Sequence, residues 1–210
     1  MNILVIGAGG RVGKKLIKGL LEEGHQVTGA SRNPDKLFVA SNYKQITLEV
    51  TDSLREIEKA IPSDTEAIYF VSGSRGKDVL KVDLHGAVKT MQAAENNNIK
   101  RYVMLSALYS MEPEKWNSII DYYTGKYFAD LYLIHQTNLD YTILQPGSLA
   151  EGEGSGKITL DVSQMPIDGQ NSIQNVADTL KEVLDKPNTF KKVIPMLDGD
   201  VLIADAISSL

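Results

Sequence analysis

The sequence predicts an α/β fold in which a doubly wound parallel sheet carries helices on both faces. The chain opens with an apolar run, residues 2–6, which leads into the glycine-rich segment 7–13 and then into an amphipathic stretch. Further along, short apolar stretches of strand length alternate with longer stretches of helical periodicity. Repeated strand–helix–strand units form parallel sheets covered on both faces, because each crossover lays its helix against the sheet.

The first half of the chain contains four predicted strands. The helix that follows the first strand begins near Val12, where apolar residues start to recur at helical spacing. A short helix is expected over residues 53–60, with Asp52 as its capping residue, and Pro34 is expected to help end the second strand. The strands are expected at residues 2–6, 26–30, 43–48 and 67–71, the last being of the largely apolar type that is buried in parallel sheets.

The second half continues the alternation and then changes character. Helices are expected at residues 79–97, 120–136 and 173–185, and strands at 101–105, 141–144 and 192–196. The glycine-rich residues 151–156 predict a surface loop. We expect a single domain over residues 1–210, in which about 148–210 supply substrate-side loops and a small C-terminal cap.

The composition restricts the classes of partner. The net charge is −5, so no general attraction to nucleic acid or to an anionic membrane is expected. The chain has no cysteine, and its three histidines lack metal-ligand spacing, so we expect no metal site. The first residues lack the pattern of a secretion signal, and no apolar run reaches the ~18 residues of a membrane span. These features predict a cytoplasmic protein that acts on a small molecule.

The spacing of the first glycines predicts a phosphate site. Glycines at 7, 10 and 13 leave backbone amides unobstructed, and the following helix directs the positive end of its dipole at the same space. A dinucleotide pyrophosphate fits that charge and geometry. The residues expected to contact it are Gly7, Gly9, Gly10, Arg11, Val12 and Gly13.

The end of the second strand favours NADP over NAD. Arg32 lies 19 residues beyond Gly13, close to the ~20 at which such sites recognise the adenosine ribose. An arginine there neutralises a 2′-phosphate, whereas a carboxylate accepts from a 2′-hydroxyl, and Ser31 can add a hydrogen bond. The alternative is an arginine that only solvates a loop. After the third strand, Glu49 and Val50 are expected near the adenine edge.

The spacing Tyr122-x-x-x-Lys126 predicts a catalytic pair. Residues four apart lie on one helical face, and a nearby ammonium lowers the pKa of a tyrosine so that its hydroxyl can act as acid or base. The lysine can also hold the nicotinamide ribose. Ser106, at the end of the fifth strand, is a candidate to orient cofactor or substrate. The alternative is that Tyr122 and Ser106 serve packing only.

Together these motifs resemble the atypical short-chain dehydrogenase/reductases, along nearly the whole chain. The likeness is strongest to the compact NAD(P)H-binding group that includes flavin/biliverdin reductase-like and epimerase-like proteins. It implies a Rossmann fold, phosphate contact at residues 7–13 and an adenosine phosphate at Arg32. It also implies contact with the nicotinamide half at Lys126 and at two segments that follow strands. These segments are Val71, Ser72 and Gly73, and Pro146, Gly147 and Ser148.

Two departures from the family pattern leave the reaction open. Gln145 stands where the family usually has arginine, and Leu108 aligns with the catalytic serine. The leading hypothesis is an NADP(H)-dependent oxidoreductase in which Tyr122 moves the proton, Lys126 assists it and Ser106 orients a ligand. The alternatives are a non-catalytic NADP(H) redox sensor, which Leu108 favours, and an epimerase-like enzyme acting on a sugar or nucleotide sugar.

Overall fold

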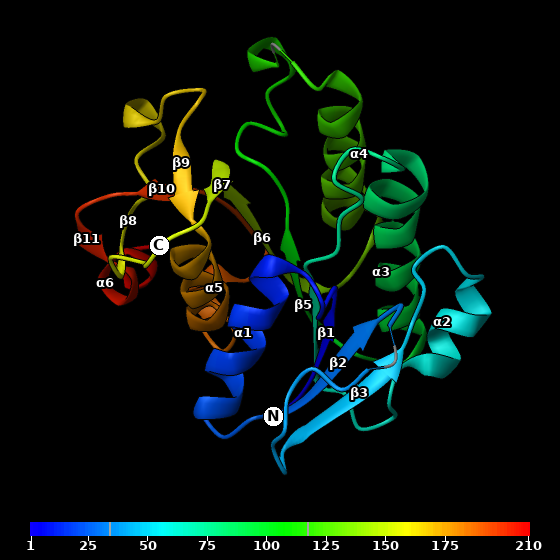
Figure 1. Ribbon diagram of the computed structural model, residues 1–210. Coiled ribbons are helices and arrows are strands. Elements are labelled where there is room, and N and C mark those ends of the chain that lie inside the picture. Colours follow the sequence, from blue (N-terminus) through cyan, green and yellow to red (C-terminus); the bar gives the residue numbers. More distant parts are fainter. Residues whose placement is uncertain (34, 117) are drawn as a thin grey trace.

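A mainly parallel sheet with helices on both faces forms the centre of the molecule, which confirms the predicted fold class (Figure 1). The computed structural model describes residues 1–33, 35–116 and 118–210, so Pro34 lies outside the described residues. The parallel strands are β1 (Asn2–Ile6), β2 (Gln26–Ser31), β3 (Tyr43–Thr47), β4 (Ala67–Phe70), β5 (Arg101–Leu105), β6 (Asp140–Pro146) and β10 (Lys192–Asp198). Two short strands, β8 (Lys157–Thr159) and β11 (Val201–Leu202), extend this sheet in antiparallel pairing.

The strand order reverses beside β1. The order along the sheet is β11-β8-β10-β6-β5-β4-β1-β2-β3, so β1 pairs with β2 on one side and with β4 on the other. In the register, Ile6 faces Ala30 of β2 and Phe70 of β4. The chain therefore leaves β1, β2 and β4 at one edge of the sheet. In open α/β sheets, ligands bind in the crevice at such a reversal.

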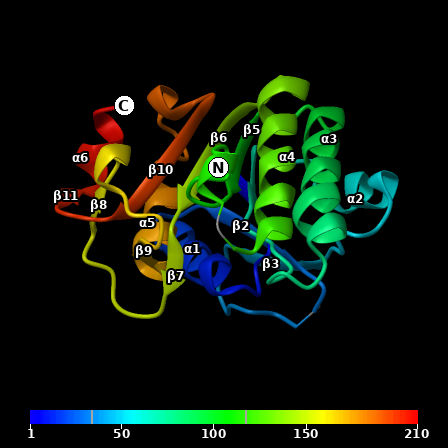
Figure 2. The ribbon, with the colours of Figure 1, turned by 90° about the horizontal axis from the view of Figure 1, so that it is seen from above.

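Alternation along the strands supplies two separate cores. In β1, Ile3 and Val5 pack on one face, and Leu4 and Ile6 pack on the other, because successive side chains of a strand point to opposite faces. The first face is covered by α1 (Arg11–Glu22), α5 (Ile173–Glu182) and α6 (Ile203–Ser208), and the second by α2 (Leu54–Ala60), α3 (Ala87–Asn96) and α4 (Ile120–Gln136). Figure 2 shows α3 and α4 side by side, with α1 and α5 on the other side of the sheet.

The start of α2 corrects the expected cap. Ser53, not Asp52, is the N-cap: its hydroxyl accepts from the Glu56 amide, and the Glu56 carboxylate accepts from the Ser53 amide. This reciprocal capping box satisfies two helix-end donors, which an aspartate one residue earlier does not reach. The Asp52 main-chain carbonyl instead accepts from the Lys89 ammonium.

The long helix expected over residues 79–97 is divided in two. Its first part is a π-helix, η1 (Val79–Gly86), and its second part is α3. The side chain of Asp78 caps η1 by accepting from the Lys81 amide at 3.4 Å. Because π-helical segments are often found at functional sites, the side chains that η1 directs inward are candidates for a functional role.

The segment after Gly147 is joined to the sheet by three strands. β10 pairs in parallel with β6 and brings β8 and β11 with it, while β7 (Ser148–Ala150) and β9 (Gln170–Ser172) form a small parallel sheet of their own. The remaining helical segments are three short 3₁₀ helices, η2 (Pro113–Lys115), η3 (Val162–Gln164) and η4 (Pro187–Thr189). Among the described residues, no helix has the length and apolar content needed to cross a bilayer.

Candidate functional site

The glycine-rich loop connects β1 to α1 and lies against the loop that follows β4. Gly7 has a φ of +99°, and a Cβ at this position would lie 2.6 Å from the Ser72 amide nitrogen. A Cβ on Gly13 would lie 2.4 Å from the Gly7 carbonyl oxygen. Both glycines therefore allow close backbone packing, and they bring the first turn of α1 next to the residues that follow β4.

The amino end of α1 is suited to an anion. Gly10 occupies the N-cap position with no side-chain hydrogen bond, and the first turn contains no acidic residue. The amides of this turn are the helix-end donors that lack intrahelical acceptors, and they carry the positive end of the helix dipole. A Cβ on Gly9 would meet only the Ser31 Cβ, at 4.0 Å, so the space beside the loop is open. The residues present fit a phosphate group.

Arg32 lies where β2 ends, with its side chain 82% exposed. Its Nε is 3.8 Å from Oε2 of Glu49, which follows β3. Ser31 donates through its hydroxyl to the Asn33 carbonyl oxygen at 2.8 Å, and Val50 is buried. The structure thus brings Ser31, Arg32 and Glu49 to the same edge of the sheet as the glycine-rich loop, because β1, β2 and β3 are parallel.

The residues expected near a nicotinamide also follow parallel strands and reach this edge. Val71 is buried and its amide donates to the Ile6 carbonyl oxygen at 2.9 Å, which fixes the start of the segment 71–73 beside β1. At the end of β6, Pro146 is buried and its carbonyl oxygen accepts from the Leu108 amide at 2.7 Å. Ser148, the first residue of β7, is exposed.

Two buried asparagines and Asp198 hold both ends of the loop between β6 and β8. Asn171 accepts from the Gly147 amide at 2.8 Å, and Asn175 accepts from the Gly156 amide at 2.9 Å. Both asparagines donate to Oδ1 of Asp198, at 3.2 and 2.8 Å. These contacts form a polar anchor, residues 171, 175 and 198, beneath a loop rich in glycine.

Lys126 is buried on α4 and has an acidic partner that the sequence did not predict. Its ammonium lies 3.6 Å from Oδ1 of Asp83 in η1, donates to the Leu105 carbonyl oxygen at 3.3 Å and lies 5.7 Å from the centre of the Tyr122 ring. The other oxygen of Asp83 accepts from the Ser74 amide at 3.0 Å. The Lys126–Asp83 pair has no net charge when both groups are ionised, so Tyr122 lies beside a neutralised ammonium.

Gly125 explains why this pair forms. A Cβ at Gly125 would lie 2.4 Å from a methyl carbon of Val79, so the missing side chain allows η1 to approach α4. That approach places Asp83 opposite Lys126. The glycine within the Tyr122–Lys126 motif therefore contributes to the position of the lysine.

Ser106 lies in a buried polar cluster formed with Ser110, Asp130 and Gln145. Oδ2 of Asp130 accepts from Ser106 at 2.7 Å, from Ser110 at 2.6 Å and from Gln145 at 3.2 Å. Burial raises the pKa of the Asp130 carboxyl to about 6, although the hydrogen bonds from Ser110 and Ser106 and the charge of Lys126 oppose this increase. Ser106 is 4% exposed, and its proton is donated to Asp130.

Sequence reasoning did not identify Asp83 or Asp130, although Asp130 carried a signal. Asp130 lies one turn after Lys126 on the same helical face, so the positions 122, 126 and 130 share one stripe of α4. A carboxylate one turn from a lysine on the same helical face is a candidate partner for that lysine. Asp83 was harder to find, because the π-helical geometry of η1 shifts which of its residues face inward.

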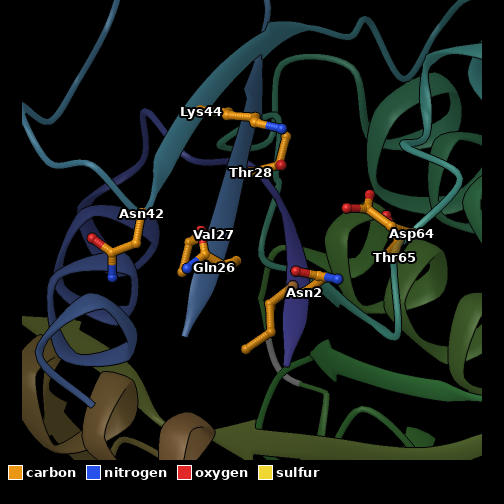
Figure 3. A pocket seen from close by; sticks show the side chains of 9 residues that line it. Asn2, Gln26, Val27, Thr28, Asn42, Lys44, Asp64 and Thr65 are labelled. Carbon is orange, nitrogen blue, oxygen red and sulfur yellow. The ribbon is translucent and has the colours of Figure 1, made fainter. Parts of the chain in front are cut away.

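A hollow of about 180 Å³ lies away from these residues. Figure 3 shows its lining side chains, which come from the amino ends of β1, β2 and β3 and from the turn before β4. They include Asn2, Gln26, Asn42 and Asp64. The glycine-rich loop lies at the opposite, carboxyl edge of the sheet, so this hollow is not part of the candidate site.

Comparison with known proteins agrees with the geometry. A family described as NAD(P)H-binding matches residues 7–187. A Bacillus subtilis protein described as "Uncharacterized sugar epimerase YhfK" is 32% identical, with full coverage of both chains. The crystal structure of the oxidoreductase ylbE from Lactococcus lactis is 42% identical, with a TM-score of 0.94, and covers 100% of this chain and 96% of that one.

A more distant structure shares the fold. It is a short-chain dehydrogenase/reductase from Veillonella parvula in complex with NADP, 20% identical, with a TM-score of 0.75 and 95% coverage of each chain. The resemblance inferred from the sequence motifs is confirmed by these relatives and by the family match, which begins at the first glycine of the loop. The chain belongs to the NAD(P)H-binding family.

Proposed function

We propose that the protein is an NADP(H)-dependent oxidoreductase that acts on a small molecule. The observation that carries the cofactor preference is the position of Arg32, whose exposed guanidinium stands at the end of β2 at the same edge as the glycine-rich loop. This is where dinucleotide sites recognise the adenosine ribose, and an arginine there suits a 2′-phosphate. The NADP complex of the Veillonella parvula protein supports the choice by analogy of fold.

Different residues of this chain would bind the cofactor and exchange a proton with the substrate. The amides at the start of α1 bind the pyrophosphate, and Arg32 binds the adenosine phosphate through a charge-assisted contact. A nicotinamide cofactor held by these residues would supply or accept a hydride. Tyr122, half-buried on α4, is the group with a proton to exchange with a substrate, and Lys126 lies behind it, paired with Asp83.

A second candidate function is a non-catalytic NADP(H) sensor. Ser106 is buried with its proton donated to Asp130, and Leu108 is buried against Tyr109, Met165 and Leu197. Neither residue therefore offers a free hydroxyl to polarise a substrate carbonyl. An epimerase-like activity on a sugar is a third candidate, favoured by the description of the Bacillus subtilis relative.

Calorimetric titration with NADP and NAD tests the cofactor proposal. Arg32→Ala should weaken NADP binding by about tenfold or more and leave NAD within about twofold, because one charge-assisted contact is lost. Lys59→Ala is the control and should leave both affinities unchanged. It removes an exposed positive charge from the last turn of α2. Equal losses for both nucleotides would exclude Arg32 from this role.

Turnover separates the enzyme from the sensor. NADPH oxidation should be followed with a panel of flavins, quinones and carbonyl compounds, and nucleotide released from the purified protein should be identified by mass spectrometry. Turnover with any acceptor supports the oxidoreductase. Tight nucleotide binding with no turnover across the panel favours the sensor, and nucleotide retained through purification together with sugar epimerisation favours the third candidate.

A further inference from the structure

Both arginines at the expected phosphate positions contact a glutamate. Arg32 Nε lies 3.8 Å from Oε2 of Glu49, and Arg11 Nη1 donates to Oε1 of Glu151 at 3.1 Å. Arg11 is the first residue of α1, and Glu151 comes from the loop after β7, 140 residues away. The positive charges that face this space are therefore already accompanied by negative ones.

The Glu49 carboxylate has a second contact, with the main chain, and is less exposed than its arginine partner. Its other oxygen, Oε1, accepts from the Thr51 amide at 3.4 Å, and its side chain is 30% exposed against 82% for Arg32. The turn after β3 thus places a carboxylate at a defined point beside the end of β2. The exposed arginine has room to turn toward a ligand, while the contact with the Thr51 amide keeps the carboxylate beside the end of β2.

From these contacts we propose that Glu49 is a specificity-determining residue and that Glu151 is an internal counter-ion of the phosphate site. Arg32 and Glu49 would together recognise the adenosine ribose: the arginine would bind a 2′-phosphate, and the carboxylate would accept from a 2′-hydroxyl. Glu151 would compete with the pyrophosphate for Arg11. This inference rests on the proposed binding of nucleotide at the glycine-rich loop and at Arg32.

The charges predict opposite effects on the two nucleotides at Glu49. A phosphate monoester carries nearly two negative charges at neutral pH, so an adjacent carboxylate repels NADP. NAD carries a hydroxyl at the same position and gains an acceptor there. Removing the charge of Glu49 should therefore favour NADP, and removing that of Arg32 should favour NAD. The wild-type protein should bind both nucleotides.

Glu151 should act on both nucleotides alike. The pyrophosphate is common to NADP and NAD, and Arg11 lies beside the helix amides that would receive it. The Arg11–Glu151 pair is exposed on both sides, at 49% and 67%, so an incoming phosphate can displace the carboxylate at small cost. Loss of the Glu151 charge should therefore raise both affinities in parallel.

Calorimetric titration of both nucleotides into the wild-type protein, Glu49→Gln, Glu151→Gln and Arg32→Ala tests the proposal, at about 50 mM and about 300 mM NaCl. Glu49→Gln should raise the ratio of NADP to NAD affinity by about threefold to tenfold, and the effect should be smaller at high salt. Glu151→Gln should strengthen both nucleotides and leave the ratio within about twofold. Glu22→Gln, at the far end of α1, is the matched control and should change neither affinity.

The outcomes separate this inference from the proposed function. An unchanged or lowered ratio in Glu49→Gln, while Arg32→Ala still loses NADP selectively, would overturn the role of Glu49 and leave the cofactor proposal intact. Unchanged affinities in Glu151→Gln would overturn its role as a counter-ion. If the wild-type protein binds neither nucleotide, or if Arg32→Ala loses both equally, the cofactor proposal fails and this inference fails with it.

Discussion

Replacing Asp130 with asparagine should change how the stability of this protein depends on pH. The Asp130 carboxyl is fully buried, and burial raises its pKa from an ordinary value of 3.8 to about 6. A carboxyl whose pKa is higher in the folded state binds its proton more tightly there, so folding is favoured while the group is protonated. This contribution is complete below about pH 3.8 and is lost as the pH rises through about 6.

The size of the effect follows from the two pKa values. The difference corresponds to about 3 kcal/mol in the free energy of unfolding, of which about half falls between pH 5 and pH 8. The asparagine of the variant would keep an acceptor for Ser106 and Ser110 but would carry no charge at any pH. On going from about pH 5 to about pH 8, the difference in the free energy of unfolding between the variant and the wild-type protein should therefore shift by about 1 to 2 kcal/mol in favour of the variant.

Urea unfolding followed by the fluorescence of Trp116 measures this difference. Trp116 is the only tryptophan of the chain and stacks on Tyr123 of α4, so its emission reports the packing of the same helix. Asp121→Asn, which removes an exposed carboxylate from the first turn of α4, is the matched control. If the difference between wild type and Asp130→Asn is the same at both pH values, the buried carboxyl does not titrate as argued.

Other substitutions test the packing and the chemistry. Gly13→Ala should destabilise the protein by about 1 to 3 kcal/mol in urea unfolding, because its Cβ would overlap the Gly7 carbonyl oxygen at 2.4 Å; unchanged stability would contradict the tight loop. Gly9→Ala should change stability by less than about 0.5 kcal/mol, since its Cβ faces open space, yet calorimetry should show weaker nucleotide binding, and full affinity would argue against phosphates at this loop. Arg101→Met should cost about 3 kcal/mol or more and lower Tm in calorimetric scans, because the guanidinium donates to three main-chain carbonyls inside the protein; a loss below about 1 kcal/mol would refute this. Tyr122→Phe should lower kcat by about 100-fold to 10,000-fold and spare nucleotide affinity, and normal turnover would make Tyr122 a packing residue.

The regular strands and helices could be predicted because each carries its own pattern. The helix over residues 120–136 and the strand over residues 101–105 have the predicted bounds, since their apolar spacing is strong and local. The short strands β7, β8, β9 and β11 have two or three residues each and exist through pairing with distant partners. No window of sequence contains enough periodicity to reveal such strands.

In the candidate site, the expected phosphate contacts follow from local sequence signals, whereas the partners of the expected catalytic residues do not. The glycine spacing and the distance to Arg32 are local signals that follow from the order of strand, turn and helix. The partners of Lys126 and Ser106 are not local: Asp83 and Asp130 reach them through the approach of η1 to α4 and through the ends of β5 and β6. Only the folded arrangement determines which carboxylate meets which cation.

The polar anchor of residues 171, 175 and 198 has a consequence for how this protein can be altered. Each end of the segment between Gly147 and Gly156 is fixed by a main-chain amide that donates to a buried asparagine. At the second end, the Ser155 hydroxyl adds a contact by accepting from Asn175. Between these two points Glu153 is exposed and can be exchanged while the attachment points stay in place, whereas a Cβ on Gly154 would lie 2.6 Å from Oδ1 of Asn175. Variants of this loop should therefore keep Gly154 together with Asn171, Asn175 and Asp198, because residues outside the loop fix where it begins and where it ends.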